Sequence, residues 1–197
     1  MGVGLELKFG NHKLGDDTAI FNMGTAKKCP ARILGLCITI NDGIKCYAEK
    51  AEDQYPTTVP LARCRQELYW KTNSALNIIE YLNKKLDKRR KLTKYLRFNE
   101  SGDFWCQEDI TKLSTIAEFI LLKGITTYGY TARSDLDFTG ARFLVKGSGH
   151  NKGNNGQTAV IRKNDPIPAG YIECPGSCKR CNLCKINIPH NIAFRKH

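Results

Sequence analysis

The sequence predicts an α/β domain in which a parallel sheet lies between an N-terminal β-hairpin and a cysteine-rich C-terminal segment. The parallel sheet follows from a strand–helix–strand order over residues 94–131, because parallel neighbours need a crossover connection, usually a helix. Alternating apolar and polar residues over 4–24, interrupted by the turn residues GNHKLGDD, predict the hairpin. The third observation is a run of four cysteines within residues 174–184.

The first half of the chain continues with a loop and then helices. Residues 25–46 are loop-like and contain one short apolar run, ILGLCITI, which is a candidate strand. A short helix is expected over 48–56, ended by Pro56. A longer helical stretch runs from about 59 to 91 with a break near Asn73. The apolar residues predicted to mark its buried face are Leu61, Leu68, Leu76, Ile79, Leu82 and Leu86.

Strands and one helix alternate in the second half of the chain. KYLRF (94–98) and ITTYGYT (125–131) are predicted strands, and they flank an amphipathic helix over 106–124 that ends at a glycine. ARFLVKG (141–147) and QTAVIRK (157–163) are further strand candidates. The segment between these two is rich in Gly and Asn, which predicts an irregular loop.

Length and composition indicate one globular domain over residues 1–197. Hydrophobic residues make up 41% of the chain and charged residues 25%, which is typical of soluble proteins. No apolar run resembles a signal peptide or a membrane span, and Glu6 does not fit a myristoylation motif, so we expect a cytoplasmic protein, in the host cell if a phage encodes it. Nine cysteines in a reducing compartment favour metal or redox chemistry over disulfides.

The four C-terminal cysteines are Cys174, Cys178, Cys181 and Cys184, in the run CPGSCKRCNLC. Thiolates at such short spacing can all bind one metal centre. The first three also have the spacing of the radical S-adenosylmethionine triad, but in those enzymes the triad lies early in the chain, and a fourth cysteine favours a closed site. The spacing predicts an iron–sulfur cluster, most simply [4Fe-4S], with residues 174–184 as the binding segment. A structural zinc site is the alternative.

Cys29, Cys37 and Cys46 form a second, wider group. Their gaps are too long for one local loop, so any shared site needs tertiary folding to close it. We predict Cys29 and Cys46 as further metal ligands, with burial as small apolar side chains as the alternative. Cys64 and Cys106 fall in helical segments and are interpreted as core or free thiols.

Charged and hydroxyl side chains follow two of the predicted strands. RFNESGD (97–103) follows one strand, and YTARSD (130–135) follows the next. Ligands of parallel α/β sheets bind beyond the carboxyl ends of strands. The alternative is that Ser101 or Asp103 only caps the following helix. The candidates for a ligand pocket, suited to acid–base work or to binding an anion, are Arg97, Glu100, Asp103, Thr131 and Arg133.

The chain is strongly basic. Lys and Arg number 31 against 19 Asp and Glu, a formal net charge of +12. This excess favours an anionic ligand or nucleic acid as a partner. The run KKLDKRRK (84–91) is the densest basic segment, and the alternative is that it faces solvent and complements a helix dipole.

Several short motifs together resemble the phage-borne gene product 88 family, from about Gly10 to Cys184. They are GN-x-KL, Cys29-Pro30, Cys46-Tyr47-Ala48, Arg63, Arg97 with Ser101-Gly102-Asp103, Thr131 with Arg133, and CP-x2-C-x2-C-x2-C. The chain departs from the family pattern at Cys37, nine residues before Cys46, and at Gln66, where an asparagine is expected. The CYA motif is also similar to that of radical S-adenosylmethionine-like phage proteins, which implies a partial (β/α) barrel.

Two function hypotheses follow. The resemblance implies a phage or mobile-element iron–sulfur protein with a redox or cluster-dependent enzymatic role. The alternative is a zinc-binding module that interacts with nucleic acid through its basic surface.

Overall fold

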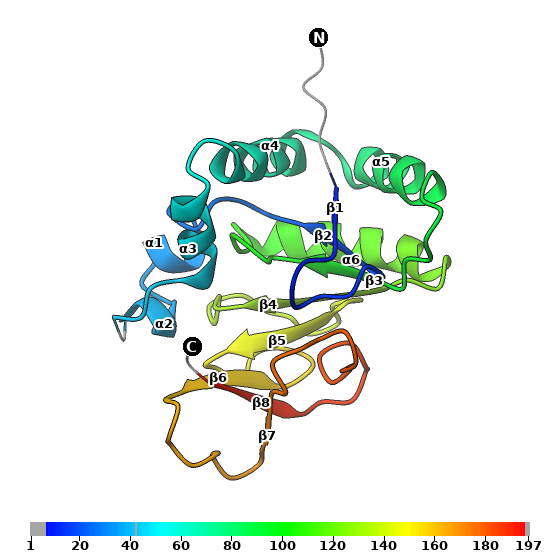
Figure 1. Cartoon of the computed structure of the whole chain (residues 1–197). Coiled ribbons are helices and arrows are strands. Elements are labelled where there is room, and N and C mark those ends of the chain that lie inside the picture. Colours follow the sequence, from blue (N-terminus) through cyan, green and yellow to red (C-terminus); the bar gives the residue numbers. More distant parts are fainter. Residues whose placement is uncertain (1–6, 42, 196–197) are drawn as a thin grey trace.

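The protein is built on an eight-stranded sheet, seen in a computed structural model that describes residues 7–41 and 43–195 (Figure 1). The strands are β1 (Lys8–Phe9), β2 (Thr18–Phe21), β3 (Tyr95–Phe98), β4 (Thr126–Thr131), β5 (Leu144–Ser148), β6 (Gln157–Ile161), β7 (Tyr171–Glu173) and β8 (Asn191–Arg195). The helices are α1 (Pro30–Ile33), α2 (Ile38–Asn41), α3 (Tyr47–Gln54), α4 (Val59–Thr72), α5 (Ala75–Asp87) and α6 (Gln107–Leu121).

The sheet is mostly parallel. Its strand order is β1-β2-β3-β4-β5-β6-β8-β7, and only the β1–β2 pair is antiparallel. This confirms the predicted α/β fold with an N-terminal hairpin, although the first residues of the predicted hairpin, 4–6, lie outside the described residues. Strands β2 to β6 follow one another in chain order, which is the order that a partial barrel requires. The last two strands, β7 and β8, were not predicted.

The helical half differs from the sequence prediction in two respects. The run ILGLCITI is not a strand: its residues fall in α1, a turn and α2. The predicted break in the long helical stretch is confirmed, since α4 ends before Asn73 and Ser74 caps α5 by accepting a hydrogen bond from Asn77 N. The buried face of this stretch was predicted in part. Ile79 and Leu82 are buried and Leu86 packs against the core, as predicted. Leu61, Leu68 and Leu76 are instead exposed, and the buried Trp70 and Ile78 were not predicted.

The sheet has two chemically different faces because strand side chains alternate. On the face that we call the helix face, Phe21 and Phe98 pack in one hydrophobic core with Trp70 of α4 and with α5 and α6. The opposite face, which we call the loop face, carries large polar and aromatic side chains. In β3 and β4 these are Tyr95, Arg97, Tyr128 and Tyr130, and in later strands they include Lys146, Ile192 and Phe194.

Residues 174–185, which we call the cysteine loop, cross the loop face. Cys174 N donates to Ala193 O of β8 at 2.8 Å, and Cys178 N donates to Lys13 O at 3.0 Å. Near the end of the loop, the Lys185 ammonium lies 4.2 Å from the centroid of the Tyr95 ring. The loop is therefore anchored to the sheet at both sides of the cysteine run.

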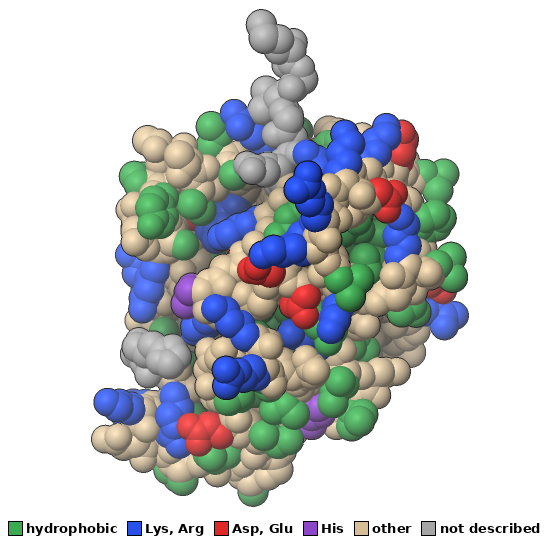
Figure 2. All heavy atoms as spheres, turned by 45° about the vertical axis from the view of Figure 1, so that its right-hand side comes forward, with side chains coloured by type: hydrophobic (Ala, Val, Ile, Leu, Met, Phe, Trp, Pro, Cys, Tyr) green, Lys and Arg blue, Asp and Glu red, His purple; other side chains and the backbone are tan. Residues whose placement is uncertain are grey.

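Basic side chains are spread widely over the surface. Figure 2 shows many Lys and Arg side chains on one face of the molecule, with few acidic ones among them. No helix within the described residues is long and apolar enough to cross a membrane.

Candidate metal centre and the carboxyl edge of the sheet

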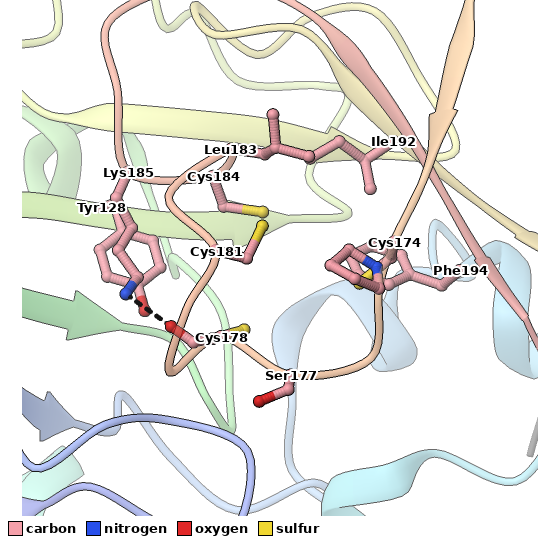
Figure 3. A pocket seen from close by; sticks show the side chains of 11 residues that line it. Tyr128, Cys174, Ser177, Cys178, Cys181, Leu183, Cys184, Lys185, Ile192 and Phe194 are labelled. Carbon is pink, nitrogen blue, oxygen red and sulfur yellow. Dashed lines mark hydrogen bonds between the residues drawn. The ribbon is translucent and has the colours of Figure 1, made fainter.

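The four predicted C-terminal ligands line a single pocket on the loop face. Cys174, Cys178, Cys181 and Cys184 all border it, although they are spread over a loop of eleven residues. Figure 3 shows the side chains of the last three pointing into the same cavity, with Cys174 across from them. The remaining walls come from Tyr128 of β4, Ile192 and Phe194 of β8, and loop residues. The structure thus brings together the donor set that the sequence predicted.

The thiols of this pocket lie partly out of water. Burial raises the pKa of Cys184 to about 11, and the Cys184 thiol also hydrogen-bonds with the Tyr130 hydroxyl. Burial likewise raises the pKa of Cys174, with further upward contributions from Cys178 and Cys181. Negative charge on all four therefore needs compensation by a cation.

Two buried lysines stand beside these sulfurs. Lys146 is 1% exposed, and Cys184 is its electrostatic neighbour. Its ammonium donates to the carbonyls of Asn155 and His190, the latter at 2.8 Å. Lys185 donates to Cys178 O at 3.1 Å, as the dashed line in Figure 3 shows. Neither lysine forms an ion pair with a described carboxylate, so their charge is available to the cysteine pocket.

Zinc and an iron–sulfur cluster place different geometric demands on a set of four thiols. Over residues 7–41 and 43–195, no three Cys, His, Asp or Glu side chains lie close enough to bind one metal ion together. A mononuclear zinc site needs all four sulfurs about 2.3 Å from one atom. In a [4Fe-4S] cluster each thiolate binds a different iron, so the sulfurs surround the centre at wider spacing. Here the four thiols border one pocket, and the buried Lys185 lines it too.

The other predicted ligands lie elsewhere. Cys29 and Cys46 stand at the N-termini of α1 and α3, and neither borders the pocket of the cysteine loop. Burial raises the pKa of Cys29 to about 12, and its electrostatic neighbours include Asp103 and Cys37. The structure therefore separates Cys29 and Cys46 from the four-cysteine pocket. A metal-binding role for these two stays a prediction. His190 does not border the pocket either, although its carbonyl holds Lys146.

The carboxyl ends of β3 and β4 are joined by a hydrogen-bonded network. Asp103 accepts bonds from the Thr131 hydroxyl at 2.7 Å, Ala132 N at 2.8 Å and Phe104 N at 2.9 Å. Arg133 donates to the carbonyls of Phe104 and Trp105 and forms an ion pair with Asp135. The structure thus brings Asp103, Thr131 and Arg133 together. Their polar groups are occupied by one another and by the backbone, which supports a bracing role.

The capping alternative for this region is wrong. The N-cap of α6 is Cys106, with no side-chain cap bond, and Asp103 binds the β4 end instead. Asp109 ties the first turn of the helix, since its carboxylate accepts bonds from Trp105 N and Trp70 Nε1, each at 2.7 Å. Burial raises the pKa of Asp103 to about 6.

Arg97 and Glu100 belong to a different cluster, formed with Tyr47 of α3. The Tyr47 hydroxyl donates to Glu100 O, and an Arg97 nitrogen donates to that hydroxyl at 3.3 Å. The Arg97 guanidinium also lies 5.1 Å from the centroid of the Tyr130 ring. Since Tyr130 bonds Cys184, a continuous row of side chains connects the cysteine pocket to the carboxyl edge.

Sequence reasoning missed Tyr47, Tyr128, Tyr130, Lys146 and Lys185. A signal was present for the two β4 tyrosines, because alternation in TTYGYT places both on one face. A lysine within the otherwise apolar strand FLVKG was also informative. Tyr47 was noted only as part of the Cys46-Tyr47-Ala48 motif, and no local signal gave either Tyr47 or Lys185 a role in a site.

A model of the family described as gene product 88 matches residues 5–142. The chain belongs to the gene product 88 family. The match includes GN-x-KL, Cys29, Cys46, Arg63 and the Ser101–Asp103 motif, and it ends before the four-cysteine segment to which the resemblance was extended. No curated protein and no solved structure matches this chain.

The family motifs have clear structural roles here. Asn11 accepts bonds from Lys13 N and Leu14 N and donates to Glu100, which closes the β1–β2 turn against the end of β3. Arg63 donates to Glu52 and to Ala48 O, and Glu52 accepts from Ala26 N. Gln66, where the family pattern has an asparagine, accepts a bond from Asn22 N at 3.1 Å. These contacts hold the segment after β2 over the carboxyl edge of the sheet.

Proposed function

We propose that this member of the gene product 88 family is an iron–sulfur protein that holds one [4Fe-4S] cluster through Cys174, Cys178, Cys181 and Cys184. The observation that carries the proposal is the convergence of these four thiols on one pocket of the loop face. When bound, such a cluster supplies one-electron transfer. The proposed role is therefore redox chemistry or a cluster-dependent reaction.

The chain's own residues support this role in three ways. Tyr128, Ile192 and Phe194 wall the pocket and limit access of water. Lys146 and Lys185 offset the negative charge of a tetrathiolate centre. The Tyr130 hydroxyl bonds the Cys184 sulfur, and hydrogen bonds to ligating sulfurs tune the electronics of a cluster.

The test is the metal content of protein purified without oxygen. Iron, acid-labile sulfide and zinc are measured per chain, together with the visible spectrum before and after reduction. We expect a brown protein with equal iron and sulfide near four per chain. The double variant Cys178→Ser, Cys181→Ser loses this content, whereas the matched variant Cys64→Ser, Cys106→Ser retains it.

Other outcomes decide between centres. Colourless protein with one zinc per chain would overturn the cluster and establish a structural zinc site. Iron that is retained in the Cys178→Ser, Cys181→Ser variant but lost from a Cys29→Ser, Cys46→Ser variant would place the centre at the carboxyl edge instead.

A further inference from the structure

Three separate segments of the chain meet around the carboxylate of Asp16, in the turn between β1 and β2. Lys91, from the segment after α5, forms an ion pair with it at 2.7 Å. Lys91, Arg89 and Lys179 of the cysteine loop all lower the pKa of Asp16. The turn, the segment that follows α5 and the cysteine loop therefore share one surface.

The cysteine loop places its own cations on this surface. Cys178 N is bonded to Lys13 O, so the loop is held against the β1–β2 turn at the residue before Lys179. Lys13, Lys179 and Arg180 are exposed, and none of them forms an ion pair with another described residue. Their charges therefore face solvent.

A shallow depression lies on the outside of the same loop. It has a volume of about 480 Å³ and is lined by Pro175, Ser177, Lys179, Arg180 and Cys181. A phosphate group fits within this space, and the two cations of its lining are suited to bind one. The depression adjoins the cysteine pocket, with which it shares Pro175, Ser177 and Cys181, whereas Lys179 and Arg180 border the depression alone.

The segment after α5 adds further positive charge beside the cysteine loop and the β1–β2 turn. Lys88, Arg90 and Lys94 are exposed, and Lys94 N donates to Asp17 O at 2.8 Å, which fixes this segment beside the turn. The Arg89 guanidinium lies 4.0 Å from the centroid of the Phe9 ring, so this side chain is held flat against β1. The side chains of this basic face are Lys13, Lys88, Arg89, Arg90, Lys91, Lys94, Lys179 and Arg180.

We propose that this basic face binds the phosphodiester backbone of nucleic acid, with the cysteine loop and the 88–94 segment as two halves of one surface. Repeated phosphates match a row of cations that come from several segments, and Figure 2 shows many Lys and Arg side chains on the face of the molecule that it draws. The inference does not depend on which metal the cysteines hold. Backbone contacts carry no base information, so the binding is expected to tolerate any sequence.

Fluorescence anisotropy with labelled 20-nucleotide probes tests the proposal, using single-stranded DNA, single-stranded RNA and duplex DNA at 50 to 200 mM salt. We expect binding that weakens steeply with salt, since each phosphate contact contributes about 0.9 to the logarithmic slope on duplex. The pair Lys179→Gln, Arg180→Gln and the pair Lys91→Gln, Lys94→Gln each lower the slope by about 2 on duplex. The three probes show whether the partner is DNA or RNA.

The matched control is Lys50→Gln, Lys163→Gln, which removes the same charge from exposed positions outside the basic face and leaves affinity and slope unchanged. Circular dichroism and metal content of every variant show that the fold and the centre are intact. Absence of binding to all three probes overturns the proposal, as does equal weakening by the control pair. If only the Lys91→Gln, Lys94→Gln pair weakens nucleic-acid binding, the cysteine loop is not part of the binding surface and the joint surface is wrong. Binding to anionic lipid vesicles without binding to nucleic acid assigns the face to a membrane instead.

Discussion

Asp103, just beyond the carboxyl end of β3, accepts a 2.7 Å hydrogen bond from the hydroxyl of Thr131, the last residue of β4. The same carboxylate accepts two backbone bonds, from Phe104 N and Ala132 N, and is 4% exposed. Two neighbouring strands are thus joined at the edge where ligands of parallel sheets bind. The contact joins the Ser101-Gly102-Asp103 motif, which follows β3, to residues 131–133 at the end of β4.

The stability of the protein is predicted to depend on the protonation of Asp103. Burial raises the pKa of this carboxyl from 3.8 to about 6, so the folded chain binds the proton more tightly than the unfolded chain. The free energy of unfolding therefore falls as pH rises from about 4 to 6, by roughly 3 kcal/mol from this group. Urea unfolding across pH 4 to 7 measures how the free energy of unfolding changes with pH. The Asp103→Asn variant is expected to lack the part of this change that comes from Asp103.

Asp137→Asn is the control for the pH experiment. The Asp137 carboxyl is exposed, and hydrogen bonds from Thr139 lower its pKa, so its contribution to stability has the opposite sign. An Asp103→Asn variant with the same pH slope as the wild type would contradict the prediction.

Gly102→Ala is predicted to prevent stable folding. Gly102 has φ +80°, and a Cβ at this position would lie 2.5 Å from Gly24 N, in backbone that has no room to move. Gly140→Ala is a matched control, because Gly140 has φ +76° but no atom within 4 Å of the added Cβ. The control is expected to cost about 1–2 kcal/mol from backbone conformation alone. Gly102→Ala is expected to cost more than about 4 kcal/mol, measured by denaturant unfolding or as loss of soluble protein.

The buried ion pair between Arg63 and Glu52 is predicted to be needed as a pair. Both side chains are less than a tenth exposed, and the carboxylate also accepts a bond from Ala26 N. Arg63→Met leaves a buried charge without its partner and is expected to cost about 3–5 kcal/mol. The exposed pair Lys84–Glu80 is the comparison, and Lys84→Met is expected to leave the unfolding midpoint nearly unchanged because solvent screens this pair. A double-mutant cycle that combines Arg63→Met with Glu52→Gln measures the coupling energy between the two side chains. If the two losses of stability simply add, the prediction that the residues act as a pair is wrong.

Much of the fold could be predicted from local sequence patterns, and the errors of that prediction have a physical origin. The strand–helix–strand order of β3, α6 and β4 is visible because the periodicity of apolar residues changes from 2 to 3.6. β7 has only three residues, too few to show a period, whereas β8 has five and was missed because it lies in the basic C-terminal tail. Leu61, Leu68 and Leu76 were assigned to the core by residue type. The core of α4 is instead Trp70, whose indole nitrogen bonds Asp109 from α6.

The candidate sites were predictable to the extent that their residues are close in sequence. The four cysteines span eleven residues, so their convergence on one pocket needs only a loop. The charge environment was not predictable, because the neighbours of Cys184 include Lys146 from β5 and Tyr130 from β4. Similarly, KKLDKRRK was identified as basic, but only the folded chain places Arg89 and Lys91 beside Lys179 across Asp16.

Lys146 is predicted to stabilise the metal centre through its charge. It is buried next to Cys184, and its ammonium is held by the carbonyls of Asn155 and His190. Burial lowers the pKa of this lysine and the Cys184 thiol raises it, so a negative centre at the cysteine pocket favours the charged ammonium. Lys146→Met removes the cation and leaves two carbonyls unpaired. We expect metal to be lost to a competing chelator at about 10-fold lower chelator concentration than in the wild type.

The matched variant Lys50→Met changes an exposed lysine and leaves chelator resistance unchanged. Because Lys146→Met also weakens folding, its metal-free form is compared by thermal unfolding, and Lys146→Arg is included to retain the charge. If Lys146→Arg restores chelator resistance while Lys146→Met lowers it, the charge acts on the centre itself. If both variants lose metal equally and melt at the same lowered temperature, Lys146 acts only by holding Asn155 and His190 in place, and the electrostatic role is wrong.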